Sequence, residues 1–274
     1  MKTQISKTSS PPISMQQQIF LKKQRKKHHQ IRFLQIGLLF FLILGWEIAA
    51  DTDAIQAFIF SSPSRIINCF FVMLKEYALL HHMWITVLET LLSFLLVSLI
   101  SIFLAIILWW FPTCSKVLEP YFVVLNSLPK SALAPILIVW LGNNMKTIII
   151  AAISVAIFGS ILSTLSAFVS VEGEKLKLIK TLGGNKWDCL RLVVIPSCIP
   201  AILNILKVNI GLCLVGVVIG EFLAAKSGLG YLIIYGSQVF KLDFVMLSIF
   251  LLCLLAMILY FSLQGVEKHF KGHF

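Results

Sequence analysis

Six long apolar segments constrain the fold of this 274-residue chain more than any other feature of its sequence. They lie at residues 33–50, 83–111, 117–141, 147–169, 201–223 and 244–263. A helix needs about 20 mainly apolar residues to cross a bilayer. Only 13% of the residues are charged, against about 25% in a soluble domain, so a single water-soluble core is excluded. The sequence therefore predicts an all-α integral membrane protein with six transmembrane helices.

The positive charges predict how these helices cross the membrane. The net charge is +11, but the lysines and arginines flank the apolar segments, so we expect no nucleic-acid partner and membrane lipid instead. With the N-terminus in the cytoplasm, sixteen of the 23 lie in cytoplasmic segments and five in outer loops. Cytoplasmic loops carry an excess of lysine and arginine. We therefore expect a multi-pass protein of the plasma (inner) membrane with both termini cytoplasmic.

Three regions are expected along the chain. Residues 1–32 form a basic cytoplasmic tail that has little to bury and is predicted to be disordered. Residues 33–266 form the transmembrane domain, and residues 267–274 form a second cytoplasmic tail. The basic run before the first span could also bind anionic lipid headgroups, or it could open a signal peptide, although no convincing small-residue cleavage site follows it.

The outer stretch between the first two spans contains a turn at residues 61–64 and then an amphipathic run, which predicts a helix along the outer membrane surface. The six cysteines are scattered without paired spacing, and the four histidines in pairs are adjacent residues that do not share a helix face. Neither a disulfide framework nor a metal site is expected.

The loop at residues 170–195 is the longest on the predicted cytoplasmic side. Glu172 and Glu174 suit the positive end of a helix that starts there, and apolar residues then recur at helical spacing. Gly183 and Gly184 interrupt the pattern, because glycine tolerates the left-handed conformation of a helix end. A second short helix follows through Trp187. Two short, basic, amphipathic helices make either a docking element for another protein or a hairpin on the lipid surface, and the residues alone leave both open.

The end of this loop carries a spaced motif. Gly183 is followed after nine residues by Val193, and then, after one more, by Ile195 and Pro196. This pattern resembles the cytoplasmic motif of importer permeases in the ABC superfamily, which reads EAA, three residues, Gly, nine residues, Ile, x, Leu, Pro. The chain departs from the motif at the EAA positions, which are Lys177, Leu178 and Ile179.

Three further stretches resemble the nitrate/sulfonate/taurine-type branch of that family. They are Ser62-Pro63-Ser64, Leu128-Pro129 to Ala134-Pro135 with Trp140-Leu141-Gly142, and Gly220-Glu221-Phe222 followed by Ser227 to Tyr231. The likeness covers about residues 36–266 and implies the fold of a type I ABC importer permease. It assigns the ATPase-coupling role to Glu174, Lys177, Leu178, Ile179, Gly183, Trp187, Val193, Ile195 and Pro196.

The resemblance also implies a division of labour. Two permease copies, expected as a homodimer, form the translocation path. Two cytoplasmic ATPases dock on the coupling loops, and an extracellular or periplasmic binding protein delivers the solute. The chain has no G-x-x-x-x-G-K-[ST] phosphate loop, so we expect no enzyme activity and no cofactor in it, with ATP and Mg²⁺ used by the partner ATPase. The branch handles nitrate, sulfonate or taurine-like anions and also thiamine-pyrimidine or flavin-like compounds. No residue of this sequence identifies which of these solutes the chain transports.

Two other classes of protein are weighed against this interpretation. A secondary transporter that works without an ATPase is the alternative, and it would be expected to show inverted repeats and several buried titratable groups. The sequence shows no internal repeat and few acids in its spans. An intramembrane enzyme would need a convergent motif such as His-Glu-x-x-His, which is absent.

Charged residues inside the predicted spans are candidates for the translocation path, because burying a charge in lipid is costly. Lys130 lies about halfway along the third span, between Pro129 and Pro135, and should face either the path or an ion-pair partner. Lys207 in the fifth span could line the path or extend to the cytoplasmic surface.

Two acids lie nearer the predicted outer ends of spans. Glu221 is expected to brace the loop of Gly228, Leu229 and Gly230, so its role should be structural. Glu89 is expected to lie at the membrane interface.

Overall fold

The computed structural model describes residues 15–271, which are helices and connecting loops without a strand. The chain divides into two compact units after residue 64. Within the described residues five helical stretches are long and apolar enough to cross a membrane, and a bent helix pair gives a sixth. The predicted fold class is therefore confirmed.

The first unit contains the long helix α1 (Met15–Asp51) and the short helix α2 (Ala57–Phe60). The part of α1 that qualifies as a membrane span is Phe33–Asp51. The predicted disordered tail is wrong for residues 15–32, which are helical, and residues 1–14 lie outside the described part. The reason is composition, since this stretch is rich in glutamine, lysine and arginine, which are good helix formers.

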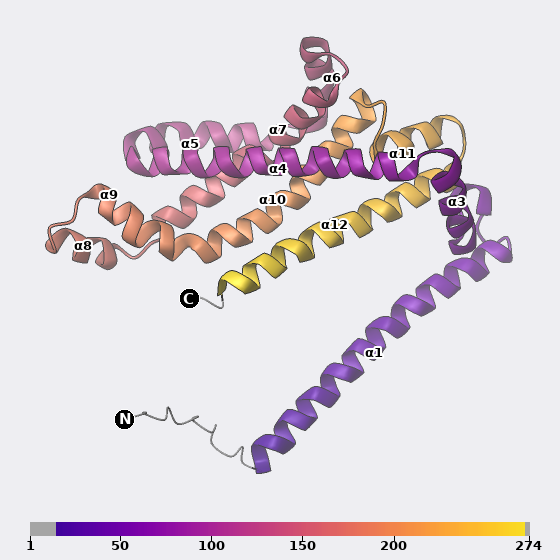
Figure 1. The fold of residues 1–274 in the computed structure, drawn as a ribbon, viewed down its shortest axis with the longest axis horizontal. Coiled ribbons are helices and arrows are strands. Elements are labelled where there is room, and N and C mark those ends of the chain that lie inside the picture. Colours follow the sequence, from indigo (N-terminus) through magenta and orange to yellow (C-terminus); the bar gives the residue numbers. More distant parts are fainter. Residues whose placement is uncertain (1–14, 272–274) are drawn as a thin grey trace, which may run out of the picture. The chain divides into compact units, whose positions relative to one another are not determined.

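The second unit is a bundle of long helices. Its core consists of α4 (Leu79–Trp110), α7 (Met145–Val169) and α10 (Ile195–Ala224), with α11 (Leu229–Gln238) and α12 (Leu242–Lys271) packed beside α10 (Figure 1). α7 and α10 approach closely at Gly216, where a Cβ atom would lie 2.6 Å from the Cα atom of Ala152. Small residues at such crossings let membrane helices pack backbone to backbone.

The predicted third span is not one straight helix. It is broken into α5 (Pro112–Ser127) and α6 (Lys130–Leu141), which are bent by 85°. Pro129 causes the break, because a proline disfavours helical geometry in the residue before it and Leu128 is accordingly extended, with φ −62° and ψ 138°. Pro120 and Pro135, in contrast, lie within their helices.

The other boundaries differ less. The predicted surface helix is present as α3 (Pro63–Glu76), in which Cys69 and Met73 are buried while Ile67 and Phe71 are exposed. The fifth span extends back through helical turns to Lys186. The predicted C-terminal tail is helical as far as Lys271, because α12 continues into it, and residues 272–274 lie outside the described part.

Candidate functional site

A helical hairpin follows α7 at the predicted coupling loop. It consists of α8 (Gly173–Thr181) and α9 (Lys186–Cys189). Gly183 between them has φ +82°, the left-handed conformation that favours glycine. Gly184 then packs so closely that a Cβ atom would lie 2.5 Å from the Ile179 side chain. The two glycines therefore set the bend of the hairpin.

The second helix of the hairpin starts at a capping box. The Asn185 side chain accepts a hydrogen bond from the Asp188 N–H at 2.9 Å, and the Asn185 N–H donates to the Asp188 carboxylate at 2.8 Å. These reciprocal bonds satisfy backbone donors that a helix start leaves free. The start of α9 is therefore fixed by local sequence.

No loop separates α9 from the long helix α10. A π-helical turn, Leu190–Val194, joins them, and its buried residues Leu190 and Val194 belong to the bundle core. The widened turn lies directly before Pro196, whose ring crowds the preceding turn and which has no N–H to donate. α9 is thus continuous with α10.

The hairpin is also fastened to the end of α4. The Lys186 ammonium donates to the backbone carbonyl of Trp110 and lies 5.8 Å and 5.2 Å from the rings of Trp109 and Trp110. Trp187 meets Trp110 edge to face at a centroid distance of 6.3 Å. A cation at a helix C-terminus is stabilised by the helix dipole, so Lys186 ties α9 to α4.

The hairpin turns an apolar surface outward. Three side chains form this exposed hairpin face, namely Leu178 (59% exposed), Leu182 (75%) and Trp187 (55%). Of the other predicted coupling residues, Glu174, Lys177 and Pro196 are exposed, whereas Ile179, Val193 and Ile195 are half-buried against their own unit. The predicted set therefore contains residues that face outward and residues that hold the hairpin in place, and Trp187 does both.

At the opposite end of the core helices, Glu221 of α10 is buried, with 1% of its surface exposed. It accepts a hydrogen bond from the Thr86 hydroxyl at 2.7 Å and from the Gly230 N–H at 2.5 Å. Thr86 in turn accepts from the Leu229 N–H at 2.8 Å. Gly228 has φ +123°, and a Cβ atom there would lie 2.4 Å from the Glu221 carboxyl carbon. Glu221 therefore holds the loop of Gly228, Leu229 and Gly230.

Glu89 of α4 does not lie at an interface as expected. It is 2% exposed, and its carboxyl group lies beside that of Glu221. The sequence contains a signal for this position that hydropathy alone misses. Polar residues recur along α4 at helical spacing and are all buried: Thr86, Glu89, Thr90, Ser93, Ser98 and Ser101. Such a stripe predicts a helix face turned toward other helices.

The same stripe continues into a polar contact among three core helices. Ser160 of α7 donates to Ser101 of α4 at 2.8 Å, and Asn209 of α10 donates to Ser160 at 2.6 Å. All three side chains are buried. Interhelical hydrogen bonds of this kind hold membrane helices in register, and Ser101, Ser160 and Asn209 were not among the predicted site residues.

Lys130 differs from its predicted setting. It is the first residue of α6, at the break after Pro129, and it is half-buried. Its ammonium donates to the Leu125 carbonyl at the end of α5 and lies 5.5 Å from the Phe158 ring centroid. Within the described residues it forms no ion pair. Its charge is therefore stabilised by a helix C-terminus and an aromatic ring.

Lys207 also differs from both predicted roles. Its ammonium forms an ion pair with Glu267 of α12 at 2.7 Å, and the side chains are only 14% and 8% exposed. It therefore neither extends to a surface nor presents a free charge to a path, and it joins α10 to α12.

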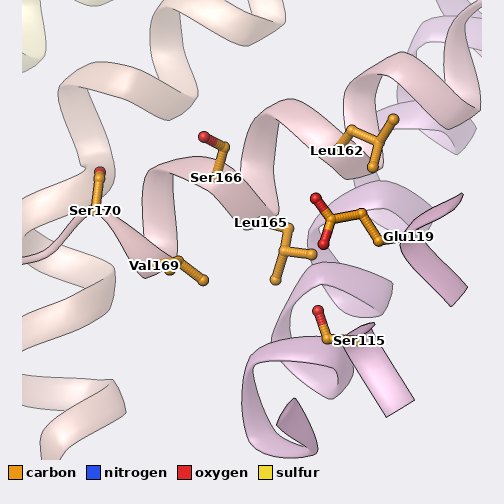
Figure 2. A pocket seen from close by; sticks show the side chains of 7 residues that line it. All are labelled: Ser115, Glu119, Leu162, Leu165, Ser166, Val169 and Ser170. Carbon is orange, nitrogen blue, oxygen red and sulfur yellow. The ribbon is translucent and has the colours of Figure 1, made fainter. Parts of the chain in front are cut away.

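A groove of about 320 Å³ lies between α5 and α7, beside the start of the hairpin. Figure 2 shows Ser115 and Glu119 on α5 opposite the residues of α7. The α7 side is mixed, with apolar Leu162 and Leu165 and the hydroxyl of Ser166. The groove can therefore accommodate a small solute that has both polar and apolar groups.

A bundle of membrane-crossing helices with a polar contact at its centre, and with a hairpin fastened to the ends of α4 and α10, is the architecture of a membrane permease. The chain belongs to the family described as binding-protein-dependent transport system inner membrane component, which it matches over residues 97–271. It is thus an ABC importer permease.

Curated relatives and a solved structure agree with this assignment. The chain is 27% identical over 229 residues to a probable ABC transporter permease protein of Haemophilus influenzae, covering 84% of this chain and 93% of the relative. It is 26% identical to the formylaminopyrimidine transport permease protein of Halalkalibacterium halodurans (84% and 92% covered) and 24% identical to the taurine transport system permease protein of Escherichia coli (86% and 87%).

The fold is similar to a chain of the MetNI methionine ABC transporter in inward-facing conformations. The TM-score is 0.64 at 16% identity, with 71% of this chain and 96% of that chain covered. This comparison supports the type I importer fold that the sequence predicted.

Proposed function

We propose that this chain forms the translocation path of an importer driven by a separate ATPase, and that the ATPase docks on the exposed hairpin face. The observation that carries the proposal is this face, with Leu178, Leu182 and Trp187 more than half exposed on a hairpin outside the core of the bundle. Large exposed apolar patches on well-anchored elements are typical of protein contacts. The ATP and Mg²⁺ would be used by that partner.

The contacts of the hairpin support a route for coupling. α9 continues into α10, Lys186 and Trp187 contact the end of α4, and α8 follows directly after α7. The three helices that share the polar contact at Ser101, Ser160 and Asn209 are therefore the three that the hairpin joins. A docked ATPase that moves the hairpin would shift these helices together, and the path with them.

The bent pair α5–α6 supports a second copy of the chain as a partner. None of the residues of α5 is buried within the unit, and α6 exposes Val139 (82%) and Trp140 (75%). We propose that these two helices face the translocation path and the second copy in a homodimer. Lys130 and the groove at Glu119 would then lie beside the path.

The proposed solute is a small organic or inorganic anion of the nitrate, sulfonate or taurine kind, or a thiamine-pyrimidine or flavin-like compound. Relatives named for taurine and for formylaminopyrimidine transport support both possibilities. A binding protein outside the membrane would deliver this solute, and we propose that the hairpin and both termini are cytoplasmic.

Copurification with the cognate ATPase tests the docking surface. Trp187→Ala should reduce the amount of ATPase that copurifies with the chain in detergent, because it removes the largest side chain of the exposed hairpin face. Trp84→Ala is the matched control, since Trp84 is 63% exposed on α4 and far along the chain from the hairpin. Equal copurification of the two variants would contradict the proposal, as would uptake by the chain without any ATPase.

A further inference from the structure

The hydrogen bonds around the two buried acids are unequal. Glu221 accepts from the Thr86 hydroxyl and from the Gly230 N–H. Glu89 Oε2 is buried and receives no hydrogen bond from any donor in the described part of the chain. An ionised carboxylate only accepts, and several donors stabilise it, whereas a protonated carboxyl group is itself a donor. The pattern therefore places the hydrogen on Glu89 and the negative charge on Glu221.

Electrostatics independently requires that the pair hold a proton. Two ionised carboxylates in contact, each at least 98% buried, would repel one another with little solvent to screen them. One hydrogen between them removes the repulsion and makes a strong charge-assisted bond. The contact between Glu89 and Glu221 thus exists only while one of the two carries a proton.

This contact joins the core to the loop after α10. Glu221 holds Gly230, and Thr86 of α4 holds Leu229. The N–H of Gly228, the last residue of the loop, donates to Nδ1 of His82 at 2.9 Å. Glu89 lies one helical turn from Thr86 on the same face of α4, so its bond to Glu221 completes the attachment of the loop to that helix.

Four other titratable groups lie on the elements that pack around the pair. His82 is on α4, and Tyr231 on α11 stacks on its ring at a centroid distance of 5.9 Å. Lys226 lies in the loop, and Lys146 lies in the first turn of α7 and is exposed. A cavity of about 190 Å³ has Glu89, Asn143, Lys226 and Ser227 in its lining. Lys226 and Asn143 are exposed, so this cavity gives Glu89 a path for exchanging a proton with water.

We propose that Glu89 and Glu221 form a binding site for a single proton, and that this proton locks the loop 225–228 and the start of α11 to α4. Loss of the proton leaves two adjacent carboxylates and releases the loop. The lock is therefore present with the proton bound and disappears when the pH is raised far enough to remove it. We infer that the lock controls solute entry, and this step rests on the proposed function. The proton site itself does not depend on it.

Difference infrared spectroscopy of the purified chain at neutral pH tests the site directly. Exposed acids are ionised at this pH, so a buried protonated carboxyl group gives an isolated C=O stretching band. We expect Glu89→Gln to remove this band and Glu119→Gln, on the exposed groove residue, to leave it unchanged. A band that is absent from the wild-type chain, or that persists in Glu89→Gln, would overturn the proposal.

Hydrogen exchange of the loop tests the lock. The glutamine amide of Glu89→Gln donates to Glu221 and cannot titrate, so the variant should keep the loop protected at alkaline pH. We expect amides 228–231 of the wild type to exchange at least about tenfold faster than those of Glu89→Gln at the same alkaline pH, and equally at neutral pH. His82→Gln should leave this alkaline difference intact.

Equal exchange of the wild type and Glu89→Gln at alkaline pH would contradict the lock. If Glu89→Gln does not fold, the wild-type chain alone tests the proposal. Its carboxyl band and the protection of its loop amides must then be lost over the same pH range, and loss over different ranges would contradict the lock. Both measurements need neither solute nor ATPase. Failure of the proton site therefore shows in the spectra, whereas failure of the proposed function shows in copurification and uptake.

Discussion

Lys207 of α10 and Glu267 of α12 form an ion pair with Nζ and Oε2 2.7 Å apart, although 60 residues separate them in sequence. Both side chains are largely buried within the unit. Hydrogen bonds between charged groups are stronger than those between neutral ones. The pair therefore holds α12 to α10 at the end of the bundle where α12 finishes.

Lys207→Met should destabilise the second unit by about 1.5–3 kcal/mol, because it removes the charge-assisted hydrogen bond between Lys207 and the Glu267 carboxylate. Thermal unfolding of the purified chain measures this. The double variant Lys207→Met, Glu267→Gln should recover most of the stability that Lys207→Met loses. Lys175→Met breaks the exposed pair with Glu172, whose side chains are 55% and 69% exposed, and should change little. A Lys207→Met variant as stable as the wild type would show that the pair contributes nothing.

Gly183→Val should uncouple ATP hydrolysis from uptake while the chain remains inserted. The residue has φ +82° and free space around it, so the change acts through backbone strain of about 1–2 kcal/mol and not through a clash. Gly173→Val is the matched control, because Gly173 also has free space but no positive φ. Reconstituted vesicles with the ATPase give both rates. Normal coupling in Gly183→Val at normal expression would count strongly against the hairpin as the coupling element.

Lys130→Met should lower uptake at least several-fold without loss of complex yield or thermal stability. Methionine keeps the apolar stem and removes the charge, and Lys130 bonds to the Leu125 carbonyl rather than to a carboxylate, so no buried acid is stranded. Lys116→Met on α5, an exposed position, serves as the control in the uptake assay. Unchanged uptake would remove Lys130 from the path, and a destabilised complex would indicate an ion pair instead.

Cysteine labelling should place the hairpin inside the cell. With the exposed Cys114 and Cys253 replaced by serine, a membrane-impermeant reagent should label Ser64→Cys in intact cells. Thr181→Cys on α8 should react only after the membrane is opened. Both positions are exposed, so a difference reports the side of the membrane and not burial. Labelling of Thr181→Cys from outside would overturn the orientation predicted from the positive charges.

Local sequence properties predicted much of this fold. Apolar length gave the number of spans, since the number of apolar residues needed to cross a bilayer does not depend on what the helix packs against. The bend of the hairpin was also predictable, because Gly183 and the capping residues Asn185 and Asp188 act on their own neighbours. Pro129 was visible in the sequence as well, yet Pro120 and Pro135 lie within helices. Only the tertiary structure therefore shows that Pro129 is the proline at which the span breaks.

The meeting of polar side chains was decided by tertiary structure alone. From hydropathy alone, Glu89 is an acid near one end of the second span, and Lys207 is a charge near the opposite side of the membrane in the fifth span. Only the rotation and crossing of α4, α10 and α12 place Glu89 against Glu221 and Lys207 against Glu267. The physical reason is that the sequence fixes how apolar each helix is along its length, whereas the partner of a buried charge depends on which helix faces meet.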